Sequence, residues 1–542
     1  MKHTLLPALL IFLSLTAQAN KFYLDPANGN LSNPGTLSAP WSTLEAVIGA
    51  GYIVSNQYSP LPYNASTSSL IPKNASGFVH EGDTLVLMNG LHGAAFLNNY
   101  INTLPITVMG MAGHTPVIEY VHLRACKNWR FEHVKVSTED FGYYLSGKLF
   151  YIESHSWQGP SSHIEIDNCE LYSTQTPWTT AADWNNLMSD GIYIKGDSVV
   201  LKNNLVRNVN FGIQAVGNYI EAEHNQVINF AGDGMRMIGS HIAFRYNLIK
   251  NCYDVNDNHD DGIQSWAQIN GVIADDNEVV GNIILNTDDT ERPLNGPLQG
   301  IGCFDGFYNR WKVMNNLIMV DHWHGITFLG AHDCEIINNT VLDLTPDITP
   351  GDSWIRINAH KDGTPSSGCL VANNVANGFY VDGQTFNNKV LNTYQQYEDN
   401  FVDYAQYDFH LLPISVLIDA ASPVYSPSDD IELNPRPFGM LPDIGAYEYT
   451  MAISGINQVD REGGFELYPN PSNGQLYIAG TEHICQLVMH DMHGRQIFSE
   501  SYSENNGLMA ISLETYESGI YILSIMPCNS HGVMKTLKVI KP

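Results

Sequence analysis

The chain has 542 residues, of which 44 % are hydrophobic, so it can bury a large core and is not a disordered protein. Lys and Arg number 26 against 56 Asp and Glu, which gives a formal net charge of −30. That balance argues against nucleic-acid binding and against electrostatic docking to an anionic membrane, because both need a basic surface. The length allows two or three domains, or one long solenoid with small modules.

The first segment has the features of an export signal. A lysine and a histidine precede an apolar run from Leu5 to Leu15, and an Ala-Gln-Ala sequence closes at Ala19. This order predicts a signal peptide over residues 1–19. The run is too short to span a bilayer, and no later stretch is long and apolar enough to do so. We therefore expect an exported protein without a transmembrane segment.

The middle of the chain repeats one short pattern, in which a glycine is followed by an apolar residue, an outward position and usually another apolar residue. Each glycine follows one of six residues: Asp190, Phe211, Asp233, Asp261, Gln299 and His324. An asparagine followed by β-prone residues comes about thirteen to sixteen residues after each glycine. These are Asn204, Asn225, Asn247, Asn277, Asn316 and Asn339, with Asn374 as a seventh.

A repeat of about 22 residues with short strands and an Asn turn is typical of one coil of a parallel β-solenoid. Asn tolerates the left-handed backbone of a tight turn, and stacked Asn side chains can form a ladder of amide hydrogen bonds. The apolar residues one and three positions after each glycine should point inward. The spacing between successive repeat glycines is longer around Gly262 and Gly300. This predicts loops inserted at the coil edges, which in solenoids commonly frame a binding cleft. The L-x-x-L-x-L pattern of leucine-rich repeats is absent.

Both flanks of the repeats carry motifs that support this fold. The entry reads F-Y-L-D-P-A-N-G from Phe22, and the closing part reads N-P-R-P from Asn434 and D-I-G-A-Y-E-Y from Asp443. Over residues 20–450 these motifs resemble secreted right-handed parallel β-helix enzymes that act on polysaccharides. The resemblance implies an all-β, right-handed β-helix catalytic domain, and we expect it to be a monomer.

The last part of the chain has a different pattern. After a break at residues 451–464, L-Y-P-N-P-S-N-G begins at Leu467, and short alternating segments continue to the end, which predicts a small antiparallel β-sandwich over residues 465–542. The motifs resemble the C-terminal sorting domain of the type IX secretion system. This implies export across the outer membrane of a Bacteroidetes-type bacterium, recognition by that secretion machinery, and a secreted or cell-surface location.

The eight cysteines show no C-x-x-C spacing, which argues against a zinc ribbon. Six lie between Cys126 and Cys369, where we expect small core residues. Cys485 and Cys528 share the C-terminal region and could pair.

Two columns of side chains should follow one face of the stacked strands, with about 5 Å between coils. One column contains the residues that precede the glycines, and it should place Asp233 and Asp261 close together, with Asp260 beside them. Adjacent carboxylates repel one another, so one can keep a proton while the other is ionised, as glycoside hydrolysis requires. An Asp before Gly can also simply cap a turn. The density of Asp, Asn and His from Asp254 to Asp261 favours a functional cluster.

The same segments resemble the N-T-D, D-D, G-H-G and R-I-K motifs of polygalacturonase-like glycoside hydrolases. The counterparts here are Asp233, Asp260-Asp261, His324 and Arg356, with Asn358 in place of the final Lys. The resemblance implies that the three aspartates share acid–base catalysis without a cofactor, that His324 tunes them, and that Arg356 binds substrate. One extra coil, at Gln299, separates the aspartates from His324.

The family 9 pectate lyases offer a second resemblance, through a D-G coil before a D-D-G coil. In that family the aspartates bind Ca²⁺, so Asp233, Asp260 and Asp261 would be metal ligands in a calcium-dependent lyase acting on a uronate polymer. Gln264 replaces one acidic ligand, and Gly302 stands where the catalytic Lys would be.

Six residues on or beside the same columns are candidates for binding a sugar chain: Arg236, Gln264, Trp266, Gln299, Trp323 and Arg356. The favoured hypothesis is a secreted hydrolase that cleaves glycosidic bonds of a polysaccharide. A calcium-dependent lyase comes second, and a non-catalytic carbohydrate-binding or adhesion solenoid third.

Overall fold

A computed structural model describes residues 19–266, 273–346 and 351–450 and, with short gaps, residues 465–541. The predicted signal peptide, apart from Ala19, and the break at residues 451–464 lie outside the described residues. The chain divides into two compact units, Met1–Tyr449 (unit 1) and Thr450–Pro542 (unit 2).

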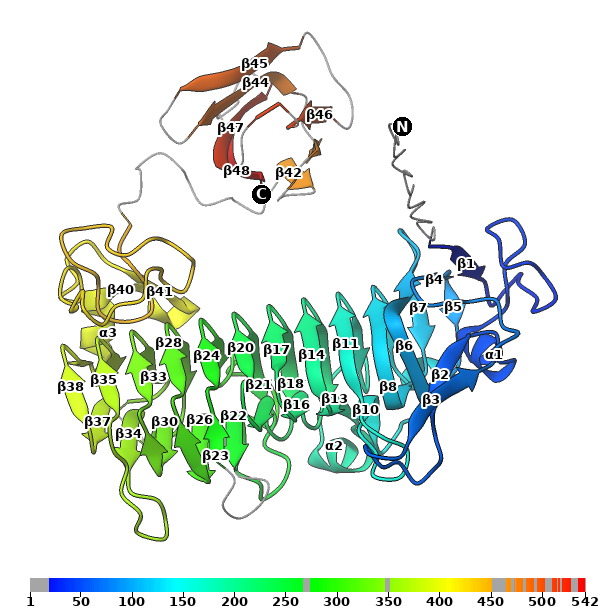
Figure 1. Cartoon of the computed structure of the whole chain (residues 1–542). Helices are drawn as coiled ribbons and strands as arrows, with labels where there is room; N and C mark the ends of the chain where they lie inside the picture. The colour runs from blue at the N-terminus through cyan, green and yellow to red at the C-terminus, as the bar shows by residue number, and fades with distance from the viewer. Residues whose placement is uncertain are drawn as a thin grey trace, which may run out of the picture. The chain divides into compact units, whose positions relative to one another are not determined.

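Unit 1 is a parallel β-helix, so the predicted fold is confirmed (Figure 1). Each full coil contributes one strand to each of three faces, here called A, B and C; faces A and B belong to one 24-stranded sheet, and face C is a 12-stranded sheet. Face A consists of the first part of β6 (Ala95–Gly110) and of β8 (Val121–Glu132), then β10 (Lys148–Glu153), β13 (Asp190–Lys195), β16 (Ile213–Val216), β19 (Met235–Ile238), β22 (Asp261–Trp266), β26 (Gln299–Asp305), β30 (His324–Leu329), β34 (Trp354–Asn358) and β37 (Gly378–Val381).

Face B follows face A around the coil, and β6 and β8 are long enough to run across both. Its strands are β1 (Lys21–Leu24), β4 (Thr84–Leu87), the second parts of β6 and β8, β11 (Ser162–Asp167), β14 (Asp197–Lys202), β17 (Ile220–Glu223), β20 (Ala243–Arg245), β24 (Glu278–Val280), β28 (Lys312–Met314), β32 (Glu335–Ile337), β35 (Leu370–Ala372) and β38 (Gln384–Phe386).

Face C completes each coil as a separate sheet. Its strands are β5 (Gly90–Leu91), β7 (Pro116–Ile118), β9 (Lys135–Val136), β12 (Glu170–Tyr172), β15 (Leu205–Val209), β18 (Gln226–Phe230), β21 (Leu248–Cys252), β25 (Ile283–Leu285), β29 (Leu317–Val320), β33 (Thr340–Asp343), β36 (Val375–Ala376) and β39 (Lys389–Val390). Between faces A and B lies a short strip of β23 (Ile273–Asp275), β27 (Phe307–Asn309) and β31 (Ala331–His332).

The remaining elements lie at the edges of the coils. They are the hairpin β2 (Ser55–Ser59) and β3 (Ser69–Lys73), the pair β40 (Phe401–Asp403) and β41 (Asp408–Leu411), and the helices α1 (Leu44–Gly49), α2 (Ala181–Leu187) and α3 (Tyr394–Asn400). Residues 391–449 pack against the outside of face C, where Arg436 and Glu448 form a fully buried ion pair at 3.0 Å. This pair explains why N-P-R-P and A-Y-E-Y occur together in the closing segment.

The inward positions of face A form one apolar column, as the repeat predicted. Ile192, Ile213, Met235, Ile263 and Ile301 are paired in register and fully buried. Six of the eight cysteines, from Cys126 to Cys369, are buried and unpaired, which confirms them as core residues. Cys485 is disulfide-bonded, and Cys528 lies outside the described residues.

The predicted asparagine ladder is present, with one correction. Eight buried or half-buried side chains are joined by amide hydrogen bonds of 2.9–3.0 Å: Asn204, Asn225, Asn247, Asn282, Asn316, Asn339, Asn374 and Asn388. The prediction of Asn277 was wrong, because it lies at the corner before β24 and bonds Gly239 and Ile242. The left-handed residue is not the ladder Asn but the one before it, such as Asn203, His224 or Gly281.

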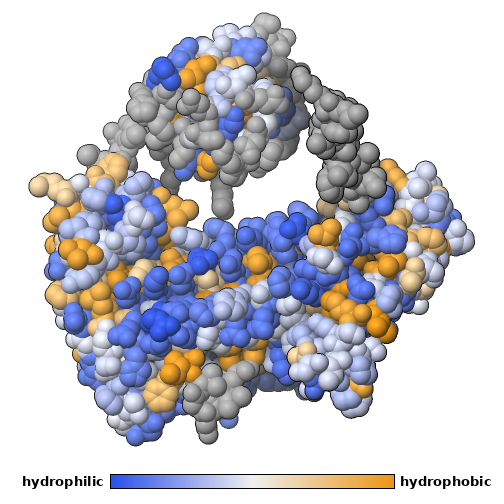
Figure 2. Space-filling view, viewed as in Figure 1, coloured by the Kyte–Doolittle hydropathy of each residue, from blue (hydrophilic) through white to orange (hydrophobic). Residues whose placement is uncertain are grey.

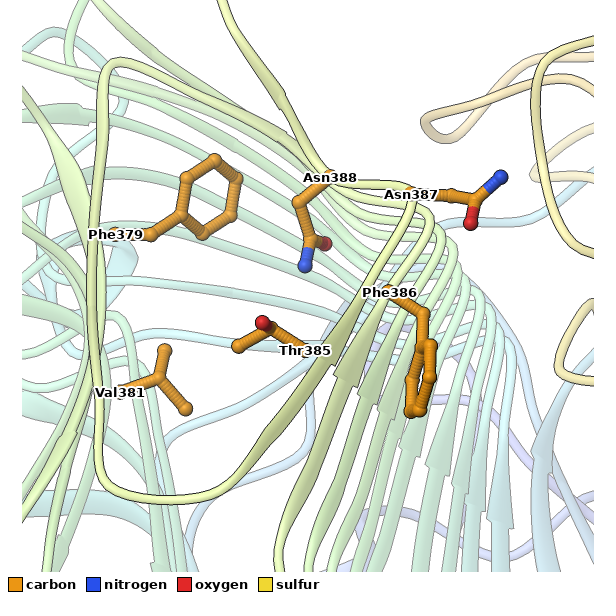
Figure 3. A pocket seen from close by; sticks show the side chains of 6 residues that line it. All are labelled: Phe379, Val381, Thr385, Phe386, Asn387 and Asn388. Atoms are coloured by element: carbon orange, nitrogen blue, oxygen red, sulfur yellow. The ribbon is translucent and has the colours of Figure 1, made fainter.

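The last coil pairs only with the coil before it. The side chains of Phe379, Val381, Thr385 and Asn388 point into this coil, where a cavity of about 440 Å³ opens (Figure 3). The visible side of the solenoid is mostly hydrophilic with scattered apolar patches (Figure 2).

Unit 2 is a sandwich of two antiparallel sheets. One contains β42 (Phe465–Tyr468), β43 (Gln475–Gly480) and β46 (Met509–Ser512), and the other contains β44 (Ile484–Asp491), β45 (Gln496–Ser501), β47 (Gly519–Pro527) and β48 (Lys535–Lys541). Both sheets contribute to one apolar core that includes Ile478 and Leu523.

Candidate functional site

The outward column on face A is as regular as the inward one. Gln214, Arg236, Gln264, Gly302 and Thr327 are paired in register from coil to coil, and the column continues to Arg356. Asp261 is paired with Gln299 in the next coil. The repeat therefore predicted correctly which side chains share this face.

Asp233 and Asp261 are in direct contact at the start of neighbouring strands. The backbone N–H of Asp261 donates to Asp233 Oδ1 at 3.1 Å, and Arg236 Nε donates to Asp233 Oδ2 at 2.5 Å. Gln264 Nε2 donates to Asp261 Oδ2 at 3.0 Å. The exposed fractions are 3 % for Asp233 and 0 % for Asp261, so neither carboxylate faces open solvent.

Burial and mutual repulsion alter the protonation of these groups. Burial is the main cause that raises the pKa of Asp261 to about 7, and the charge of Asp233 adds to it. Burial also raises the pKa of Asp233, but the Arg236 guanidinium opposes that shift. Contact with His259 opposes the shift at Asp261, so the pair contains one carboxyl bound to Arg236 and one that lies beside an imidazole.

Asp260 lies deeper than the sequence suggested. The Cys252 thiol donates to Asp260 Oδ2 at 3.3 Å, while Asp260 Oδ1 is buried without a hydrogen-bond partner. Burial raises the pKa of Asp260 to about 8, and the nearby charges of Asp233 and Asp254 raise it further. Cys252 gave no sequence signal beyond being a small core residue.

His259 is the exposed member of the cluster, which the sequence pattern did not indicate. Its side chain is 71 % exposed, and Nδ1 lies 3.7 Å from Asp261 Oδ2. Contact with Asp261 raises the pKa of His259 to about 8. The imidazole thus connects the buried carboxyl of Asp261 to solvent.

Arg236 is held between two aromatic rings. Its guanidinium carbon lies 3.5 Å from the ring centroid of Phe211 and 5.2 Å from that of Trp266, and Nη1 donates to Gln214 at 3.1 Å. Since its Nε also donates to Asp233, the guanidinium of Arg236 contacts other residues of the site on several sides. Its geometry therefore suits positioning of Asp233 better than the expected contact with substrate.

Gly302 has a steric reason to be glycine. A Cβ added there would lie 2.2 Å from Asp261 Oδ1, far inside van der Waals contact. The carboxyl of Asp261 therefore occupies the space that a side chain in the next coil would need. A lysine at this position is incompatible with the observed placement of Asp261.

His324 belongs to a separate aromatic cluster. Nδ1 lies 2.9 Å from Thr327 Oγ1, and the ring packs edge-on against Trp354 and Phe304. Burial lowers the pKa of His324 to about 3, so the ring is neutral near pH 7. It lies two coils beyond Asp261, about 10 Å at the usual strand spacing. The structure thus separates His324 from the three aspartates that it was expected to tune.

The other predicted binding residues also lie around this column. Trp323 is 39 % exposed and stacks at 6.2 Å on Trp354. Arg356 Nε donates to Asn358 at 2.5 Å. Gln299 is buried, and its Oε1 has no hydrogen-bond partner among the described residues.

The present contacts of the aspartates do not fit a calcium ion. Calcium takes six to eight oxygen ligands, roughly at 2.3–2.6 Å. Here one oxygen each of Asp233, Asp260 and Asp261 is already taken by Arg236, Cys252 or Gln264, and the arginine brings a positive charge. Among the described residues, no group of three His, Cys, Asp or Glu side chains is arranged to hold a metal ion.

Comparison with known proteins identifies one part of the chain. Residues 466–541 match the family model described as "Secretion system C-terminal sorting domain". The predicted type IX sorting domain is thereby confirmed, and the protein is exported as a secreted or cell-surface protein of the Bacteroidetes. None of the described helices has the length and apolar character needed to cross a membrane.

Unit 1 has structural neighbours but no close sequence relative. No curated protein sequence matches the chain. The pectate lyase Pel9A is 14 % identical, with a TM-score of 0.37, and the match covers 80 % of this chain and 97 % of that one. A mannuronic acid specific family 6 lyase from human gut microbiota is 12 % identical, with a TM-score of 0.35 and coverages of 64 % and 82 %.

A third neighbour is tailspike protein 2 of an Escherichia coli O157:H7 bacteriophage. It is 9 % identical, with a TM-score of 0.33, and the match covers 85 % of this chain and 59 % of that one. Similarity at this level does not assign an activity to the chain.

Proposed function

We propose that unit 1 is a polysaccharide-cleaving enzyme that hydrolyses glycosidic bonds with an acid–base pair formed by Asp233 and Asp261. The observation that carries the proposal is a pair of buried aspartates in different environments: Asp233 accepts from the backbone N–H of Asp261 and from Arg236, whereas the carboxyl of Asp261 faces His259. Such a difference allows one carboxyl to keep a proton while the other is ionised.

The proposed roles follow from these contacts. Asp233, paired with Arg236 at 2.5 Å, is the ionised partner that draws a proton from the attacking water. Asp261, with a pKa near 7, holds the proton needed by the leaving oxygen. Because Asp261 is fully buried, we assign His259 as the group that passes this proton between Asp261 and the bound sugar. Asp260 contributes only through its packing and its contact with Cys252.

Substrate would lie along face A beyond the aspartates. Trp323 offers an exposed ring for stacking against a sugar, and Arg356 and Gln264 offer hydrogen-bond donors on the same outward column. The buried Gln299 supports this surface from the next coil. The stacked coils provide equivalent positions at regular spacing, which suits a polymer.

Hydrolysis explains the residues better than β-elimination does. Elimination needs a base beside a uronate carboxylate, and the position for a lysine in the next coil is Gly302, which Asp261 closes to any side chain. The contacts of the carboxyls to Arg236, Cys252 and Gln264 also support hydrolysis, because a calcium ion would need those oxygens as ligands.

The test is a polysaccharide panel that includes pectate, alginate, chondroitin, carrageenan and xylan. The purified full chain is assayed for new reducing ends and for ultraviolet absorbance of unsaturated uronate ends, with and without EDTA. Hydrolysis predicts reducing ends without the absorbance, unaffected by EDTA and lost in Asp261→Asn. Absorbance that disappears with EDTA would instead establish the calcium-dependent lyase, and binding without cleavage would leave the adhesion hypothesis.

A further inference from the structure

A second feature lies at the corner between faces A and B, away from the aspartates. The corner residues Asn128, His163, Ser198, Tyr219 and His241 follow one another from coil to coil, all with φ near +55°. The shared backbone conformation aims their side chains outward in one column. Tyr219 stacks on His241 at 4.8 Å, with the rings 4° from parallel.

The stack of rings is interrupted by one coil. Ser198 stands between His163 and Tyr219, so the corner position next to Tyr219 in this column carries no ring. Two coil steps separate His163 from Tyr219, about 10 Å. A flat ring placed above Ser198 would lie about 5 Å from each, which is the separation seen between Tyr219 and His241.

The next outward column also has a small side chain in the coil that carries Ser198. Glu165, Val200 and Glu221 are paired in register, so the coil that carries Ser198 also carries a short apolar side chain between two carboxylates. The result is a notch over β14, with Ser198 and Val200 as its floor. The notch is part of a cavity of about 390 Å³, which extends past His163 and Glu165 to the preceding coils at Asn128, Arg130 and Pro105.

We propose that this notch binds a pyranose ring of a neutral glycan. The Tyr219 ring is 59 % exposed and supplies the stacking surface that sugars prefer, and the two carboxylates can accept hydrogen bonds from hydroxyl groups. Arg130 also lines the cavity, where its Nη2 donates to Glu165 at 2.6 Å, so the lining residues carry one more carboxylate than guanidinium group. That charge disfavours a uronate or sulfated ring.

The notch would hold a polymer on face B while the reaction occurs on face A. The proposal gives the proposed enzyme a second glycan contact, but binding here does not depend on cleavage. The notch and the candidate active site can therefore be tested separately.

The experiment is native affinity electrophoresis of the full chain in gels that contain xylan, glucomannan or, as the anionic comparison, pectate. All samples carry Asp261→Asn to prevent turnover. We expect a neutral polysaccharide to retard the protein. Tyr219→Ala removes the stacking surface, and Ser198→Tyr fills the notch with the chain's own ring, a residue type that the same backbone conformation already accepts at Tyr219. Each should weaken the apparent affinity at least fivefold.

The matched control is Tyr246→Ala, which removes another corner tyrosine, stacked on His224 at 5.3 Å but outside the notch. It should bind like the parent, and thermal melting should show that all variants are folded. Unchanged binding in both notch variants, or no retardation of the parent in either neutral gel, would overturn the proposal. Retardation by pectate alone would also overturn it. None of these results bears on cleavage, which the reducing-end assay reports independently.

Discussion

The asparagine ladder and the aspartate site are both columns of buried polar side chains, but they differ in how completely their hydrogen bonds are formed. Asn282 accepts from the backbone and side chain of Asn247 and donates to Asn316 and Phe244. In contrast, Asp260 and Asp261 each keep one buried oxygen that has no hydrogen-bond partner among the described residues. Buried polar atoms are normally satisfied. Other described residues, such as His92 and Asp343, also keep an unpaired buried atom, so it is the combination of unpaired oxygens with neighbouring carboxyls that distinguishes the aspartate site.

The largest loss of stability should come from breaking the ladder. Asn282→Ala removes an amide that serves both neighbouring coils, so that Asn247, Asn316 and Phe244 each lose a buried hydrogen bond. We expect the free energy of unfolding to fall by about 2–4 kcal/mol. Denaturant titration measures this free energy, and Asn186→Ala at an exposed position is the control. An equal effect of the two substitutions would contradict a structural role for the ladder.

A smaller loss should follow from Gly302→Ala, because the new Cβ would meet Asp261 Oδ1. The carboxyl must move, which should cost about 1–3 kcal/mol and reduce cleavage, since the Asp233–Asp261 contact is disturbed. Gly378→Ala is the control, because the nearest side-chain atom to a Cβ there is 3.7 Å away. If Gly302→Ala retains full activity, the position of Asp261 does not matter for the reaction.

The carboxyl cluster should also make stability depend on pH. Burial raises the pKa of Asp260 from 3.8 to about 8 and that of Asp261 to about 7, so the folded state binds more protons than the unfolded chain across this range. Stability should therefore fall as pH rises from about 4 to about 8, with at most about 1.4 kcal/mol per pH unit for each proton.

Asp260→Asn should flatten this dependence, whereas Asp257→Asn at an exposed position of the same loop should not. Melting temperatures measured from pH 5 to pH 8 give the comparison. A stability that rises with pH over this range, or an identical slope in Asp260→Asn, would contradict the assignment of raised pKa values.

The smallest expected effect is on substrate binding by a partly exposed side chain. Trp323→Ala removes an exposed ring and should raise KM about fivefold, from about 1 kcal/mol of stacking, with little change in kcat or melting temperature. Trp157→Ala, another exposed tryptophan, is the control. A fall in kcat at constant KM would place Trp323 nearer to the reacting atoms than we propose.

The sequence predicted the fold well because the repeat is a physical consequence of stacking. Gly191 and its equivalents recur since each coil must present the same small residue beside the next, as the near contact of Gly191 with Gly212 shows. The same regularity predicted the outward column and the pairing of Asp233 with Asp261. The ladder position in the long coil was missed, because the inserted loop placed Asn277 and Asn282 at two different corners.

The local chemistry of the site was less predictable. Register shows which residues share a face, but not that Asp260 turns inward to Cys252, or that Arg236 bends back to Asp233 between two rings. Nor could the sequence show that His259, on an irregular loop, is the exposed partner of Asp261. These arrangements depend on side-chain directions and loop paths, which the period of the repeat does not set.

The most direct test of the central claim measures cleavage and stability together on Asp261→Asn. If the carboxyl is kept for catalysis, neutralising it should lower kcat by about 100-fold or more on whichever polysaccharide is cleaved, and should leave the unfolding free energy at pH 7 unchanged or higher. Retained activity, or a loss of stability as large as that of Asn282→Ala, would contradict the account, because Asp261 would then be another structural member of the stack.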